Sequence, residues 1–173
     1  MKVKLIICLL LFTVLSFCAC QKKDDYLSYQ SYPMSITGDF CVNSILCDVT
    51  VEMTAMGEAQ ISFEDPESLE EYRFTVDKKG FWVYYDDISI PLDPKGVGMG
   101  VSILPEMFSC NEASLCEINS AKIGGKEYTG YVYSENDCRI TVYFESDSKI
   151  PSVLRLQSED SCAVFKVDSI SYI

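Results

Sequence analysis

The stretch from Asp48 to Glu64 reads DVTVEMTAMGEAQISFE and decides the fold. On both sides of Met56-Gly57, apolar residues stand at every second position, and mostly polar residues fill the positions between them. Because successive side chains of a β-strand point to opposite faces, this alternation is typical of a strand with one buried face. The glycine after Met56 is a residue typical of turns. The stretch therefore predicts two antiparallel strands joined by a tight turn.

The same period of two recurs along much of the remaining chain. Apolar and polar side chains alternate over residues 72–76, 88–92, 140–144 and 163–167, where β-branched and aromatic residues are frequent, as in strands generally. Short clusters of Gly, Asp, Asn and Ser separate many of the runs. The pattern predicts a mainly β protein with about ten strands in a meander. Such a sheet must bury one face, so we expect it to curl on itself or, alternatively, to fold into a β-sandwich.

One stretch departs from this rhythm, at residues 96–108. Four of its apolar side chains stand near helical spacing, at Met99, Ile103, Met107 and Phe108. Pro105 limits any helix here to a turn or two, because proline lacks the backbone donor of a helix interior. We expect one or two short helices that cover the concave side of the curled sheet.

Composition narrows the classes of function. The 173 residues include 14 Lys and Arg, 26 Asp and Glu and no histidine, which gives a formal net charge of −12. This acidity argues against nucleic acid as a partner, because phosphate binding needs a basic face. The missing histidine removes the commonest general base and the His-paired Ser and Cys nucleophiles. With no phosphate-loop or calcium-loop motif either, we expect a protein that is not an enzyme and holds no cofactor or metal.

The first 20 residues, MKVKLIICLLLFTVLSFCAC, resemble a bacterial lipoprotein signal peptide. Lys2 and Lys4 form a positively charged start, and the apolar run that follows is too short to span a bilayer comfortably. Ala19-Cys20, followed by polar residues, resembles a lipoprotein processing site, where the cysteine is lipidated and becomes the new N-terminus. We expect residues 1–20 to be this signal peptide and Cys20 to be the lipidation site. The alternatives are an ordinary secretory signal cut nearby and an uncleaved anchor.

Lipidation at Cys20 predicts a bacterial protein that is anchored to the cell membrane by acyl chains such as palmitate and faces away from the cytoplasm. Two acyl chains suffice for stable anchoring. Loss of Lys2 and Lys4 leaves 12 basic and 26 acidic residues, a charge of −14, so anionic headgroups should repel the domain. We expect residues 21–31 to be a polar tether and residues 32–173 to form a single β-rich domain.

A series of short motifs resembles the LolA-like family, which includes the outer-membrane lipoprotein carriers. The motifs are Asp65-Pro66-Glu67-Ser68-Leu69, Tyr72-Arg73-Phe74, Lys79-Gly80, Val83-Tyr84-Tyr85 and Ile88-Ser89-Ile90-Pro91-Leu92. In order and spacing, the resemblance covers most of residues 34–173. It implies a half-barrel, that is, a half-open antiparallel barrel around an apolar cavity, with residues 96–116 as a helical lid.

Carriers of this family use the cavity to shield acyl chains, so the resemblance implies binding of an apolar ligand or a lipidated partner at the membrane. Methionine and aromatic side chains give an adaptable apolar surface. The candidate cavity lining is Met53, Phe63, Phe74, Phe81, Met99, Ile103, Met107 and Phe108. The alternative is that these side chains fill a closed core and that the protein is a non-enzymatic interaction or sensor module of the cell envelope.

Six cysteines remain after removal of the signal and lipidation of Cys20. They are Cys41, Cys47, Cys110, Cys116, Cys138 and Cys162. An even number in an exported chain indicates disulfides, although their pairing stays open. Cys41 and Cys47 have the same spacing as Cys110 and Cys116, so each pair would close a local loop or the two pairs would meet. A cross-strand bridge would join Cys138 and Cys162. Free thiols are the alternative. A zinc site is not expected, because structural zinc sites use shorter spacings.

Overall fold

The computed structural model describes residues 26–55, 57–93, 99–135, 137–159 and 161–173. The strands are β1 (Met34–Val42), β2 (Ile45–Ala55), β3 (Glu58–Asp65), β4 (Arg73–Asp77), β5 (Gly80–Tyr85), β6 (Ile88–Leu92), β7 (Leu115–Ile123), β8 (Lys126–Glu135), β9 (Cys138–Glu145), β10 (Pro151–Gln157) and β11 (Cys162–Tyr172). The helical segments are η1 (Ser28–Ser31), η2 (Glu67–Leu69), α2 (Met99–Ser102), α3 (Leu104–Met107) and η3 (Glu112–Ser114). No helix within these ranges has the length and apolar character needed to cross a membrane.

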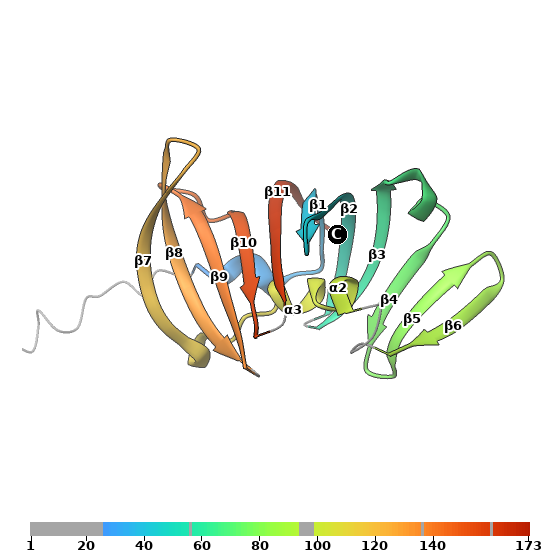
Figure 1. Ribbon diagram of the computed structural model, residues 1–173. Coiled ribbons are helices and arrows are strands. Elements are labelled where there is room, and N and C mark those ends of the chain that lie inside the picture. The colour runs from blue at the N-terminus through green and yellow to red at the C-terminus, as the bar shows by residue number, and fades with distance from the viewer. Residues whose placement is uncertain (1–25, 56, 94–98, 136, 160) are drawn as a thin grey trace, which may run out of the picture.

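All eleven strands belong to one antiparallel sheet, in the order β6-β5-β4-β3-β2-β1-β11-β10-β9-β8-β7. Two meanders, β1–β6 and β7–β11, meet where β1 pairs with β11. The sheet curls into an open arch (Figure 1), which confirms the expected curled antiparallel half-barrel. The alternative of a β-sandwich is wrong, because the pairing of β1 with β11 joins both meanders into a single sheet.

The period of two in the sequence corresponds to two faces of the sheet. The stretch from Asp48 to Glu64 spans most of β2 and nearly all of β3, and its apolar residues, such as Val49, Val51 and Ile61, are buried. The polar residues between them lie on the outer face and are exposed or partly exposed. Strand β1 shows the same alternation of buried and partly exposed positions. The buried sides of the central strands form one continuous core on the concave face.

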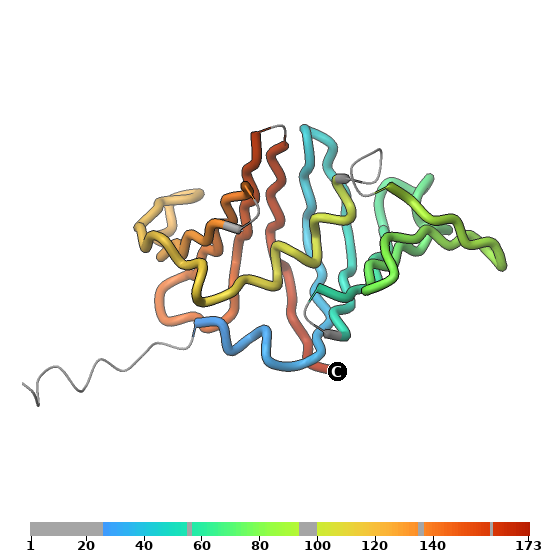
Figure 2. The backbone as a smooth tube through the Cα atoms, turned by 90° about the horizontal axis from the view of Figure 1, so that it is seen from below, coloured from blue at the N-terminus to red at the C-terminus, as the bar shows by residue number. Residues whose placement is uncertain are grey.

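Residues 99–108 cover the middle of the concave face, as the sequence predicts. Four side chains of this lid segment are buried in the core: Ile103, Leu104, Met107 and Phe108. Helix α3 contacts both β2 and β10, and Figure 2 shows the segment running across the central strands. Pro105 stands in the first turn of α3, where proline is tolerated. At Gly100, an added Cβ would lie only 3.1 Å from a methyl carbon of Val42, so glycine permits this close approach.

The segment before β1 also packs on the core. Tyr29, in η1, is buried, and its ring meets that of Phe144 edge-on at a centroid distance of 6.1 Å. Tyr26 stacks on Tyr131 with centroids 3.8 Å apart. The structure therefore places residues from 26 onward on the domain, whereas a polar tether was expected over residues 21–31. The reason is that aromatic side chains in this segment find apolar partners on the sheet.

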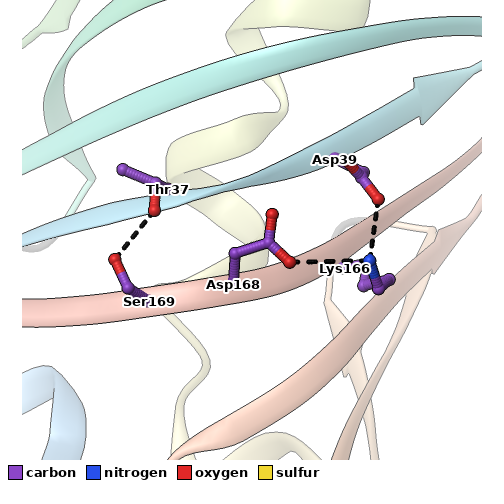
Figure 3. Close-up of polar contacts among 5 residues, drawn as sticks. All are labelled: Thr37, Asp39, Lys166, Asp168 and Ser169. Atoms are coloured by element: carbon purple, nitrogen blue, oxygen red, sulfur yellow. Dashed lines mark hydrogen bonds and ion pairs between the residues drawn. The ribbon is translucent and has the colours of Figure 1, made fainter.

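Side-chain contacts on the outer face mark the seam between β1 and β11 (Figure 3). Thr37 lies opposite Ser169, with 2.8 Å between their hydroxyl oxygens. Lys166 lies opposite Asp39, and its Nζ donates to the carboxylate at 2.9 Å. Asp168 is the extra residue of a β-bulge here, and its carboxylate is 3.5 Å from the same ammonium. Opposed polar pairs of this kind favour one register of the two strands.

Candidate functional site

Most of the residues predicted to line a cavity lie on the concave face and are buried. The buried members are Met53, Phe63, Phe81, Ile103, Met107 and Phe108. Phe74 is partly buried against the same core, and the side chain of Met99 lies outside the described part of the structure. The structure thus brings the described members of the set together on one face. Whether they also bind a ligand stays a prediction.

In the middle of the concave face, the lid segment packs directly on the sheet. The ring of Phe108 meets Phe165 edge-on at a centroid distance of 5.1 Å, and Phe165 in turn contacts Phe40 at 6.3 Å. Beside this cluster, a pocket of about 140 Å³ is lined in part by Met34 and Met53. Cavities that hold drug-sized ligands measure roughly 300–1,000 Å³. The middle of the concave face is therefore largely filled by the protein's own side chains.

The same apolar face continues past the lid onto β4, β5 and β6, where it becomes exposed. We call this surface the open wing. It consists of Phe74, Val83, Tyr85, Ile88 and Ile90, which the strand register places on one face, and of Tyr72, whose ring stacks on Tyr85. The exposed fractions are 36% for Tyr72, 40% for Tyr85, 59% for Ile88 and 52% for Ile90. Figures 1 and 2 show β5 and β6 extending beyond the lid segment.

Aromatic contacts connect the open wing to the core. Phe74 meets Phe63 edge-on at 5.6 Å and stacks on Phe81 at 6.0 Å. At the outer end of the wing, Tyr72 stacks on Tyr85 with centroids 5.1 Å apart. Because Phe63 and Phe81 are buried, the exposed rings of the wing rest on a packed base. The wing is therefore a preformed apolar surface.

Acidic residues border the outer end of the open wing. Glu70 and Glu71 come just before Tyr72, and Asp86 and Asp87 form the turn between β5 and β6. The charge of Glu71 raises the pKa of the Tyr85 hydroxyl, and a hydrogen bond with Glu71 and the charge of Asp86 add to this effect. The raised pKa indicates a negative potential at this end of the wing.

The edge strand of the wing is poorly suited to pairing with another strand. Strand β6 has only five residues and contains Pro91, which has no backbone N–H to donate. Short edge strands with proline discourage edge-to-edge pairing. The wing therefore offers its face, rather than its edge, to a partner.

No disulfide joins any of the six cysteines of the domain, all of which lie in the part of the chain that the structure describes. Cys41 lies opposite Leu46, whereas Cys47 lies opposite Phe40 and is buried, so the two sulfurs belong to opposite faces. Cys110 is buried, and Cys116 is exposed with its thiol 3.3 Å from the carbonyl oxygen of Val132. Both local pairs thus place one thiol in the core and the other outside it.

The remaining pair of cysteines lies on strands that are not neighbours. Cys138 begins β9 and Cys162 begins β11, as expected, but β10 lies between these strands. Two inter-strand spacings amount to roughly 9.5 Å, which exceeds the reach of a disulfide. No group of three His, Cys, Asp or Glu in the described ranges is arranged to hold a metal ion.

Sequence reasoning found strand β6 but missed the exposure of the open wing. The alternation over Ile88 to Leu92 predicts a strand with one apolar face, and such a pattern does not say what covers that face. The feature that indicates exposure is the position of this strand at the edge of the sheet, several strands away from the central strands that the lid covers. Tyr72 belongs to the alternating stretch at 72–76 and Tyr85 to one of the motifs of the family resemblance, and neither pattern indicates that the two rings stack on an exposed surface.

No protein-family profile matches this chain, and no curated protein matches it in sequence. Among solved structures, an uncharacterised conserved protein from Thermus thermophilus is similar, with a TM-score of 0.51, 14% identity and 88% of each chain covered. This likeness shows a shared fold.

Two further solved structures are similar at lower scores. In the complex of Pseudomonas aeruginosa MucA and MucB, the likeness has a TM-score of 0.41 and 10% identity, and covers 84% of this chain and 53% of that chain. A LolA superfamily protein from Nitrosomonas europaea has a TM-score of 0.41 and 8% identity, with 86% and 92% covered.

Proposed function

We propose that this protein is a lipid-anchored, non-enzymatic binding module of the bacterial envelope, and that the open wing is its binding surface. The observation that supports the proposal is the exposed apolar face of β4–β6, next to a core that the chain itself covers. Contiguous exposed apolar surface on a folded domain marks an interaction site. The anchor is the expected lipid on Cys20, which lies outside the described residues.

The charges around the wing favour a basic partner. Four carboxylates border its outer end, at Glu70, Glu71, Asp86 and Asp87, and the whole chain has a net charge of −12. Complementary charge speeds association and disfavours acidic partners. We therefore propose that the partner is a polypeptide segment with apolar side chains flanked by Lys or Arg.

Binding of two designed amphipathic peptides to the full-length protein in detergent tests the proposal. One peptide alternates Leu with Lys and the other alternates Leu with Glu, so that only their charge differs. We expect the Leu/Lys peptide to bind. Salt should weaken this binding, because it screens the attraction between exposed charges. Equal binding of both peptides, or of neither, would contradict the proposal.

A pair of matched variants locates the contact. Ile88→Ser in the wing should weaken binding of the Leu/Lys peptide by about tenfold, the effect of losing one apolar anchor. Ile118→Ser is the control, because Ile118 on the far edge strand β7 is 58% exposed, almost the same as Ile88. An equal loss in both variants would indicate non-specific attraction instead of a defined surface.

An acyl chain is a second candidate ligand, because the pocket of about 140 Å³ beside Met53 and Phe108 has room for one end of such a chain. In this case a fluorescent fatty acid should bind the protein, and Phe108→Trp should displace it by filling the pocket. If the fatty acid binds and Ile88→Ser leaves its affinity unchanged, the cavity rather than the wing is the ligand site. Absence of fatty-acid binding would remove this candidate.

The proposed anchor has a separate test. Mass spectrometry of the native protein should show an N-terminus at Cys20 carrying acyl chains. Cys20→Ser should leave the chain unacylated. An unmodified N-terminus elsewhere would indicate an ordinary secretory signal, and an intact residue 1 would indicate an uncleaved anchor.

A further inference from the structure

The outer face of the sheet holds a polar pocket that the proposed function does not use. It measures about 160 Å³ and is lined by Asn119, Arg139, Thr141, Tyr143, Arg155 and Gln157. These residues come from β7, β9 and β10, on the side of the sheet opposite the lid and the apolar core. A single water needs only about 10–15 Å³ of such space, so the pocket has room for a small organic molecule.

Strand register builds the pocket. Thr141 lies directly opposite Arg155, and Arg139 lies opposite Gln157, so these four side chains share one face of two neighbouring strands. Gly130 on β8 lies opposite both Asn119 and Tyr143. A Cβ on Gly130 would lie 2.8 Å from the Tyr143 ring and would overlap the Asn119 amide oxygen. The missing side chain thus lets these two residues close one end of the pocket.

The pocket concentrates positive charge in an acidic protein. It contains two of the three arginines of a chain with a net charge of −12. Arg139 donates to the carboxylate of Glu117 at 2.6 Å. Arg155 has no ion pair with any residue that the structure describes. The charges of Arg139 and Glu117 therefore cancel, and the positive charge of Arg155 is left without a partner among the described side chains. Its planar guanidinium can form two parallel hydrogen bonds to a carboxylate.

Neutral polar groups complete the pocket. The Oδ1 atom of Asn119 is buried and has no hydrogen-bond partner among the described residues. Thr141 is only 8% exposed and presents a hydroxyl next to Arg155. A buried acceptor without a donor is unfavourable, so a ligand that supplies an O–H or N–H here would gain affinity. The ring of Tyr143 adds one apolar wall.

We infer that this pocket binds a small carboxylate with a hydroxyl or amino group next to it. Arg155 pairs with the carboxylate, and the neighbouring donor satisfies the amide oxygen of Asn119. Two kinds of molecule carry this shared chemistry, namely acidic sugars and amino acids. The pocket faces away from the open wing, so the two sites are independent.

Calorimetric titration of the full-length protein in detergent tests the inference. Glucuronate represents the acidic sugars and glutamate represents the amino acids. Glucose and inorganic phosphate are the comparison ligands, because glucose has no negative charge and phosphate is a tetrahedral anion without a planar carboxylate. We expect at least one of the two carboxylates to bind more tightly than both comparison ligands. The tighter ligand of the two shows whether the pocket prefers acidic sugars or amino acids. Tighter binding of phosphate or glucose, or no binding of either carboxylate, would overturn the assignment.

Matched arginine variants locate the site. Arg155→Gln should weaken carboxylate binding by about tenfold or more, because the uncompensated cation is lost. Arg73→Gln is the control, since Arg73 is the third arginine and lies over the ring of Tyr84 at 5.2 Å, away from the pocket. Arg155→Gln should leave binding of the Leu/Lys peptide to the wing unchanged. Equal loss of carboxylate binding in both variants would overturn the site.

Discussion

Gly38 shows how a single residue determines the packing of the seam. It lies on the concave side of β1, where an added Cβ would overlap the backbone carbonyl oxygen of Lys166 and lie 2.8 Å from the ring of Phe165. Phe165 is buried and contacts Phe40 and Phe108. The space that glycine leaves empty is therefore occupied by the aromatic centre of the core.

Gly38→Ala should lower the free energy of unfolding by about 3 kcal/mol, because overpacking here displaces backbone as well as a ring. Gly124→Ala is the control. Gly124 has a φ of +57° and no atom within 4 Å of an added Cβ, so only the backbone conformation is penalised, at roughly 1 kcal/mol. Urea unfolding of both variants measures the difference, and equal losses would show that crowding at the seam is unimportant.

Burial predicts which thiols of the domain react. Cys116 and Cys162 are exposed, whereas Cys47 and Cys110 are buried. Burial raises the pKa of the Cys47 thiol, and the nearby carboxylates of Asp65 and Asp48 raise it further. Because the thiolate is the reactive form, Cys47 should resist alkylation in the folded protein even when the pH reaches the ordinary thiol pKa.

Peptide mapping after timed alkylation checks this order. The two exposed thiols should be modified first, and Cys47 and Cys110 only after addition of urea. The raised pKa of Cys47 also means that the unfolded chain ionises at a lower pH than the folded one. Its contribution to stability is therefore present below the ordinary thiol pKa and is lost as the pH rises above it. A disulfide in the native protein would appear as a pair of cysteines that never reacts without reductant.

Among the elements, the lid segment and the open wing differ in what they contribute to stability. Phe108→Ala in the lid should cost about 3–5 kcal/mol, because this buried ring leaves a cavity beside Phe165. Ile90→Ser in the wing should change stability by roughly 0.5 kcal/mol or less, as exposed substitutions usually do. Thermal unfolding of both variants measures the contrast. A large loss for Ile90→Ser would mean that the wing is structural and not a free surface.

The sequence predicts elements better than it predicts what covers them. Alternation located the strand that holds Ile88 and Ile90, yet the same alternation occurs whether a face is buried or open. Tyr29 has no periodic neighbours, so its burial depends on a contact with distant strands. Arg139 and Arg155 are 16 residues apart, and only the register of β9 with β10 brings them to one pocket. Such placements depend on tertiary packing, which local pattern does not contain.

At the scale of the whole molecule, order should decrease from the seam toward both edges of the sheet. The central strands β1, β2, β10 and β11 bury their inner faces under the lid and η1, whereas β6 and β7 each have one neighbour. Amide hydrogens with few buried neighbours exchange through local opening. Hydrogen-exchange mass spectrometry should therefore find slow exchange in the central strands and fast exchange in β6 and β7. Uniform exchange across the sheet would contradict this gradient.

The pairing of the first strand with the last has a consequence for biosynthesis. A chain leaves the ribosome from its N-terminus, so β1 (Met34–Val42) emerges long before its partner β11 (Cys162–Tyr172). Until β11 has been made, β1 has no neighbour on one side, and its apolar face lacks the half of the core that β7–β11 supply. Contacts between such distant segments form slowly, and unpaired strand edges aggregate. Before the seam closes, the chain therefore exposes an unpaired strand edge beside an apolar face, the combination that favours pairing with other chains.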